Sequence, residues 1–115
     1  MTKKKILFTG MSSYLGRNFI TRIGELRDYK LICYSRKKIK GIRTVAGNLS
    51  EKRKIEKATK DVDIIVHMAS ETSGGNREIL RLTNVLGTEN LVESAIRNKV
   101  KKFIYSASSS VYGNQ

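Results

Sequence analysis

The sequence predicts one α/β domain built around a mostly parallel β-sheet. Short apolar runs alternate with segments of helical periodicity along all 115 residues, as in chains where strands are joined by crossover helices. The run DIIVHMA at 63–69 is apolar throughout, which is typical of a central strand covered on both faces. A glycine-containing turn, TGMSSYLG at 9–16, follows the first apolar run and leads into a helical pattern.

Four elements are predicted in the first half of the chain. KILFT (5–9) is short, rich in β-forming residues and followed by glycine, which indicates a buried strand. A helix is predicted over 14–26, where apolar residues recur at helical spacing: Leu15, Phe19, Ile23 and Leu26. Strands are predicted at 30–34 (KLICY) and 43–47 (RTVAG). The link between these two strands is too short for a crossover helix, so a loop is expected there.

The second half continues the alternation. EKRKIEKATK (51–60) predicts a short polar helix with Ile55 and Ala58 facing inward. The apolar run at 63–69 is the next strand, and KFIYSA (102–107) is the last. Between them, residues 78–98 predict a long amphipathic helix whose apolar positions are Ile79, Leu82, Val85, Leu86, Leu91, Val92 and Ala95.

The charge of the chain is strongly positive. Lysine and arginine number 23 against 10 aspartates and glutamates, a net charge of +13 at pH 7. The basic residues cluster at 3–5, 36–40, 52–54 and 99–102. Such a field attracts polyanions, either nucleic acid or phosphorylated small molecules. The alternative is a lysine-rich surface that is simply solvated.

Several classes of protein do not fit the sequence. No apolar run approaches the roughly 20 residues of a membrane span, and the apolar run after the basic start is too short for a signal peptide. The only cysteine, Cys33, excludes an internal disulfide and is expected to be an inert buried thiol. His67 is the only histidine, so it is expected to be packed in the core, with no metal site. A cytoplasmic location is expected by default.

The turn at 9–16 fits a phosphate-binding turn between a strand and a helix. Gly10 permits a tight turn, and Gly16 lets the helix approach the strand. Ser13 stands where a middle glycine is usual, and its hydroxyl could donate to a phosphate oxygen. The helix start would offer free backbone N–H groups to a pyrophosphate. The alternative is an α/β protein that binds no nucleotide and uses these glycines for packing alone.

Five segments, in order and at matching spacing, resemble the NAD-dependent epimerase/dehydratase family, the extended short-chain dehydrogenases/reductases. TGMSSYLG resembles the family's TGxxGxxG, with Ser13 as the departure. AGNLSE (46–51) resembles its GDL segment, with Asn48 in place of aspartate. The other three segments are DVDIIVHMAS (61–70), TNVLGTENLVESA (83–95) and KKFIYSASSSVYG (101–113), which resemble DxVxHLAA, NVxGTxNLLEAA and KRFVYxSSxxVYG.

The resemblance implies a Rossmann-like, doubly wound sheet of strand order 3-2-1-4-5, with the cofactor across the carboxyl ends of the strands. Asn48 and Leu49 would hold adenine, and Asn84 would face the cofactor from the long helix. Ser108 matches the catalytic serine, although Ser106, Ser109 or Ser110 could take its place. The remaining cofactor-binding residues would be Gly10, Ser13, Tyr14, Leu15 and Gly16 at the pyrophosphate turn and Met68, Ala69 and Ser70 after the fourth strand.

The cofactor is predicted to be NADP in preference to NAD. NAD-binding proteins favour a carboxylate at the end of the second strand, where it accepts from the ribose hydroxyls. Here that place reads Ser35-Arg36, and no carboxylate follows before Glu51. The Arg36 guanidinium could pair with a 2′-phosphate, and Ser35 could add a hydroxyl. The alternatives for Arg36 are exposure to solvent and stacking on adenine.

The resemblance covers about the first third of such an enzyme. Residues 1–115 would be the N-terminal portion of a dinucleotide-binding domain, truncated after the fifth strand and without the substrate domain. The family's YxxxK motif is absent, so the chain alone is expected to be inactive, while the full-length enzyme would act on a nucleotide sugar by hydride transfer.

The exposed edge of the predicted sheet and the positive charge of the chain bear on which other partners are expected. The apolar edge FIYSA is expected to be exposed and prone to pairing, and a homodimer through residues 78–98 is plausible. No membrane partner is expected. Nucleic acid is an unlikely partner, and the alternative function is a non-catalytic basic module that binds nucleic acid or has a regulatory role. A gene product without activity is the third possibility.

Overall fold

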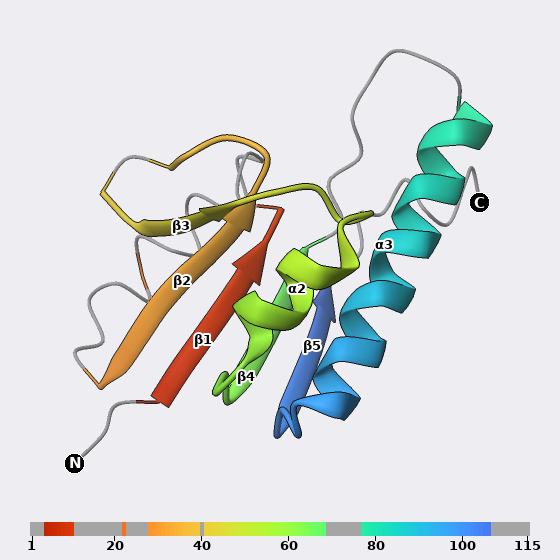
Figure 1. Cartoon of the computed structure of the whole chain (residues 1–115). Coiled ribbons are helices and arrows are strands. Elements are labelled where there is room, and N and C mark those ends of the chain that lie inside the picture. Colours follow the sequence, from red (N-terminus) through yellow and green to blue (C-terminus); the bar gives the residue numbers. More distant parts are fainter. Residues whose placement is uncertain (1–3, 11–21, 23–27, 40, 69–76, 107–115) are drawn as a thin grey trace.

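The computed structural model describes residues 4–10, 22, 28–39, 41–68 and 77–106. Five strands form one parallel sheet in the order β3-β2-β1-β4-β5, as predicted. Two helices, α2 (Lys52–Thr59) and α3 (Arg77–Arg97), lie side by side on one face of that sheet (Figure 1). The strands are β1 (Lys4–Thr9), β2 (Tyr29–Ser35), β3 (Arg43–Ala46), β4 (Ile64–Met68) and β5 (Lys102–Ser106).

The side chains of the central strands alternate between two apolar clusters, as the pleat of a strand requires. On the face that α2 and α3 cover, Leu7 and Ile65 are fully buried with Ile55 of α2. On the opposite face, Phe8 is fully buried with its neighbours Ile6, Cys33, Val66 and Met68. Both faces of β1 and β4 are therefore apolar and buried, which explains the uninterrupted apolar runs in the sequence.

Helix α2 faces the sheet as its sequence predicts. Ile55 is 0% exposed and Ala58 is 8% exposed. Thr59 is also buried, and its hydroxyl donates to the Ile55 carbonyl at 2.8 Å. The Asn98 side chain, just after α3, donates to the Thr59 hydroxyl at 2.8 Å. The end of α3 is thus tied to the end of α2.

Helix α3 departs from the single apolar face predicted for it. Leu91 and Ala95 are buried, but Val85, Leu86 and Val92 are 38–49% exposed. The side toward the sheet is completed by smaller or polar residues instead, namely Gly87, Asn90 and Ser94. These residues recur three and four positions apart with Leu91 and Ala95, so they share one helix face. At Gly87 a Cβ would collide with the Leu49 side chain, so only glycine fits there, and the bulky residues Val85, Leu86 and Val92 are the exposed ones.

The connections and the sheet edge agree with the sequence where they are described. No helix occurs in the described part of the link between β2 and β3. The helix predicted over 14–26 falls, except for Arg22, outside the described residues. Strand β5 is an edge strand, and Ile104 and Tyr105 are each 49% exposed, as predicted for the segment FIYSA. In the ranges that the structure describes, no helix has both the length and the apolar character needed to cross a bilayer.

Candidate functional site

The carboxyl edge of the sheet gathers the predicted cofactor-binding residues that the structure describes. Gly10 follows β1, Arg36 follows Ser35 at the end of β2, and Asn48 and Leu49 follow β3. Met68 ends β4. Because all five strands are parallel, these positions share one edge of the sheet. The other predicted residues lie outside the described residues: Ser13, Tyr14, Leu15, Gly16, Ala69, Ser70 and Ser108.

Gly10 brings the ends of β1 and β4 into backbone contact. Its φ is +76°, in the left-handed region that favours glycine. A Cβ atom at Gly10 would collide with the carbonyl group of Met68. Gly10 therefore has the backbone conformation that a tight turn needs, and no space for a side chain remains between the two strand ends; the rest of the predicted turn lies outside the described residues.

The turn after β3 is closed by two side-chain hydrogen bonds and one backbone hydrogen bond. The Asn48 side-chain oxygen accepts from the Ser50 N–H at 3.3 Å. The Glu51 carboxylate reaches back and accepts from the Asn48 N–H at 3.0 Å. The Glu51 N–H donates to the Asn48 carbonyl, also at 3.0 Å. These three hydrogen bonds hold the turn closed directly before α2, whose N-cap residue is Glu51.

Neighbouring elements hold the same turn from two sides. The Tyr34 hydroxyl donates to the Asn48 carbonyl at 2.7 Å, and a Cβ at Gly47 would collide with that hydroxyl. Burial, and secondly the charge of Glu51, raise the pKa of Tyr34 to about 12. From α3, the Asn90 side chain donates to the Leu49 carbonyl at 2.8 Å. Strand β2 and helix α3 therefore fix the position of Asn48 and Leu49.

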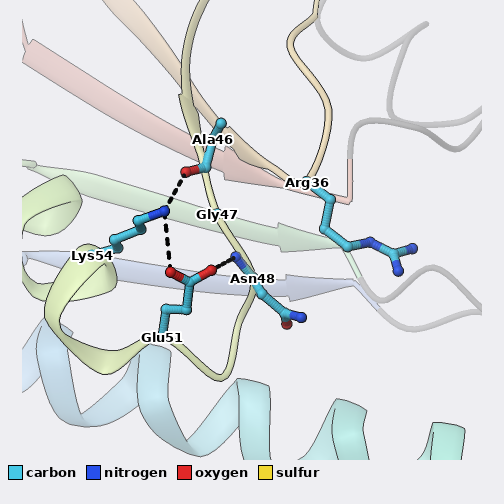
Figure 2. Close-up of a pocket in the computed structure, with 6 residues that line it drawn as sticks. All are labelled: Arg36, Ala46, Gly47, Asn48, Glu51 and Lys54. Carbon is cyan, nitrogen blue, oxygen red and sulfur yellow. Dashed lines mark hydrogen bonds and ion pairs between the residues drawn. The ribbon is translucent and has the colours of Figure 1, made fainter.

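A cavity of about 250 Å³ opens at the ends of β2 and β3 (Figure 2). Arg36, Asn48, Glu51 and Lys54 contribute its polar side chains, with Ala46 and Gly47 between them. Lys54 forms an ion pair with Glu51, with 3.1 Å between Nζ and Oε2. Hydrogen bonds from the Asn48 N–H and then from Lys54 lower the pKa of Glu51. The pocket therefore contains two cations and one ionised carboxylate.

Sequence reasoning found Arg36 and Asn48 but did not assign Glu51 or Lys54 to the pocket. The available signal was the spacing of Asn48 and Glu51, three residues apart and just before a helical pattern, which lets the Glu51 side chain reach back to the Asn48 N–H. Two other residues predicted to bind the cofactor, Ser35 and Asn84, do not line this pocket. The Ser35 hydroxyl accepts from the Lys37 N–H at 3.4 Å, and Asn84 lies on α3 and is not among the residues that line this pocket.

His67 connects β1, β4 and α3 next to the same edge. Its Nδ1 is bonded to the Thr9 hydroxyl, and its Nε2 lies 2.9 Å from the Thr88 hydroxyl. The Thr88 hydroxyl donates its only proton to the Asn84 carbonyl, also at 2.9 Å, so it must accept from Nε2–H. His67 is thereby assigned as the Nε2–H tautomer, with Thr9 donating to Nδ1. The packed histidine predicted from the sequence is confirmed.

His67 is expected to make the protein less stable in mild acid. Burial lowers the pKa of His67 from its usual 6.5 to about 4. Between those two values the unfolded chain binds more protons than the folded one, so the free energy of unfolding falls as the pH falls. From pH 7 to pH 5 the loss due to His67 is about 2 kcal/mol. Denaturant titrations of the wild type and of His67→Gln at pH 7 and at pH 5 measure this loss. An equal change in the free energy of unfolding with pH in the two proteins would contradict its assignment to His67.

Two further side-chain predictions can be compared with the structure. Cys33 is 0% exposed, and burial raises the pKa of its thiol to about 11, so the predicted buried thiol is confirmed. In the described ranges, no three potential ligands come together to hold a metal ion.

Comparisons with known proteins place the chain in one family. A sequence model of the NAD dependent epimerase/dehydratase family matches residues 6–115. The UDP-N-acetylglucosamine 4,6-dehydratase (inverting) of Campylobacter jejuni is 28% identical over a match that covers 89% of this chain and 35% of that protein. The UDP-glucose 4-epimerase of Vibrio cholerae is 27% identical, with 96% of this chain and 36% of that protein covered.

Among solved structures, the enzyme WbmH of Bordetella bronchiseptica, in complex with NAD+, has the same fold as this chain. Its TM-score is 0.79 at 23% identity, and the match covers 99% of this chain and 42% of that one. The chain thus spans between about a third and two fifths of the length of the relatives named here. The family match runs from β1 to the last residue, and the chain also has the strand order and the carboxyl-edge geometry described above. The chain therefore belongs to the NAD-dependent epimerase/dehydratase family.

Proposed function

We propose that this chain binds a nicotinamide dinucleotide along the carboxyl edge of its sheet. The observation that supports this most directly is the conformation of Gly10, whose backbone lies against the end of β4 with no side chain between them. A pyrophosphate needs such close access to main-chain N–H groups. Asn48 and Leu49 would hold the adenine ring, in a turn already fixed by Tyr34 and Asn90.

The dinucleotide of this proposal is NADP rather than NAD. Arg36 lines the pocket at the end of β2 and makes no ion pair with any other described residue. A guanidinium in that place suits a 2′-phosphate, because it can donate two parallel hydrogen bonds to it. The one carboxylate in the pocket, Glu51, already has a lysine and a backbone N–H as partners, so it is a poor acceptor for ribose hydroxyls.

Replacing Arg36 by alanine tests the cofactor. NADPH affinity is expected to fall about tenfold or more, while NADH affinity changes little, because NADH lacks the 2′-phosphate. Calorimetric titration of both nucleotides into wild type and variant measures this. Arg43→Ala is the matched control, since Arg43 is exposed at the opposite end of β3. An unchanged ratio of the two affinities in Arg36→Ala would refute the NADP preference.

The reaction of the whole protein, in this proposal, is hydride transfer between the nicotinamide and a nucleotide sugar. The two relatives named above are enzymes of UDP-sugars. Ser108 would bind the reacting oxygen of the substrate. The general base and the substrate-binding residues would come from a part that this chain does not include. The chain alone would bind the dinucleotide without turning over a sugar.

A homodimer through α3 belongs to the same proposal. Val85, Val92 and Ile96 recur seven and four positions apart, so they form one exposed apolar stripe on that helix. Burying this stripe against a second copy would remove it from water. Sedimentation at micromolar concentration is expected to show a dimer, and Ile96→Glu is expected to give a monomer. A monomeric wild-type chain would refute the dimer.

A further inference from the structure

The pocket at the ends of β2 and β3 contains a carboxylate with a cation dedicated to it. Lys54 lies 3.1 Å from Glu51 and also donates to the Ala46 carbonyl at 3.4 Å. In Figure 2 the Lys54 amino group sits between these two acceptors, and the Arg36 guanidinium points away from them. Lys54 is therefore the cation that neutralises Glu51, while Arg36 forms no ion pair with another residue in the described ranges.

Each oxygen of the Glu51 carboxylate already has one partner within the turn. One oxygen accepts from the Asn48 N–H at 3.0 Å, and the other is bound to Lys54. Loss of the Lys54 charge would leave the second oxygen free and negatively charged in the same pocket as Arg36. A free carboxylate accepts from ribose hydroxyls and repels a phosphate, which is the pattern of sites that prefer NAD.

We infer that Lys54 is a specificity-determining residue that maintains the preference for a 2′-phosphate by neutralising Glu51. This inference rests on the proposed dinucleotide binding. Lys54 acts as a positioning residue: it does not need to touch the phosphate, because its effect passes through the carboxylate. The charge of the polar lining is +1 with Lys54 in place, counting Arg36, Lys54 and Glu51, and it falls to zero without Lys54.

A double-mutant cycle tests the inference. NADPH and NADH are titrated calorimetrically into the chain and into Lys54→Met, Glu51→Gln and the double variant. Lys54→Met is expected to lower the preference for NADPH over NADH about three- to tenfold, an effect of the size that partly exposed charges produce. In the Glu51→Gln background the same substitution is expected to change that preference less than about twofold, because no carboxylate remains to be released.

Two controls separate this effect from a general loss of charge or of structure. Lys57→Met removes the same charge from the same helix but outside the pocket lining, and it is expected to leave the preference unchanged. Lys54→Arg keeps the charge and is expected to retain the preference. Both Glu51 and Lys54 have side chains about half exposed, at 43% and 52%, so none of these variants disturbs the core.

The outcomes distinguish this inference from the proposed function. An equal loss of preference in the presence and absence of Glu51 would mean that Lys54 acts on the phosphate directly, and would overturn the inference. No change in Lys54→Met would also overturn it. A wild-type chain that binds neither nucleotide refutes the proposed function, and the inference falls with it. A wild-type chain that binds both nucleotides but prefers NADH leaves dinucleotide binding standing and refutes both the NADP preference and the inference that Lys54 maintains it.

Discussion

Replacing Gly10 by alanine is expected to abolish dinucleotide binding and to destabilise the fold by about 3 kcal/mol. The residue has φ +76°, a conformation that costs an alanine about 1–2 kcal/mol. The new Cβ would also collide with the Met68 carbonyl, so the ends of β1 and β4 would have to separate. The N–H groups of the turn would then no longer meet a pyrophosphate in the required arrangement.

Calorimetric titration with NADPH and denaturant unfolding measure the two effects. Gly41→Ala is the matched control, since Gly41 also has a positive φ, +84°, but a Cβ there meets no atom within 4 Å. Gly41→Ala should therefore show the conformational cost alone and retain NADPH binding. If Gly10→Ala bound NADPH as tightly as Gly41→Ala does, the assignment of Gly10 to the cofactor turn would be wrong.

Replacing Phe8 by alanine is expected to reduce the free energy of unfolding by about 4 kcal/mol. Phe8 is 0% exposed and lies on β1, opposite Cys33 of β2 and Val66 of β4. Both neighbouring strands hold its surroundings in place, so the core cannot close around the missing ring, and a cavity remains. A loss of this size is a large share of the roughly 5–15 kcal/mol by which domains are stable.

Urea unfolding of Phe8→Ala, Phe8→Leu and Ile104→Ala measures this effect. Phe8→Leu retains most of the volume and should cost roughly 1 kcal/mol. Ile104 lies on the same sheet but is 49% exposed on the edge strand, so its loss should cost much less than that of Phe8. Equal effects of the Phe8 and Ile104 alanine variants would mean that the face of the sheet bearing Phe8 is not a packed core.

The sheet could be predicted from the sequence because its strands are apolar on both faces. The runs at KILFT and DIIVHMA correspond to β1 and β4, and all five predicted strands agree with the structure to within one or two residues at each end. Alternation of strands and helices predicts parallel pairing. The orientation of α3 could not be read in the same way, because apolar residues occur on two sides of that helix and only packing against the sheet decides which side is buried.

The candidate site was predictable only in part. Residues that end strands, such as Gly10 and Asn48, follow directly from the strand boundaries and the family motifs. Glu51 and Lys54 are held at the pocket by the hydrogen bond from the Asn48 N–H and by their ion pair, and this arrangement depends on hydrogen-bond geometry rather than on residue type. Tyr34 and Asn90, which bind this turn, lie 14 and 41 residues away from the residues that they contact. Local sequence patterns cannot predict contacts over such separations.

The position of β1 in the middle of the sheet has a consequence for synthesis of the chain. Its pairing partners are residues 29–34 on one side and 64–67 on the other. At about 5–20 residues per second, the second partner is translated roughly 3–12 s after β1. During that interval one edge of the apolar segment around Phe8 has no native neighbour. On the ribosome, this first strand is therefore exposed to non-native pairing until β4 has been synthesised.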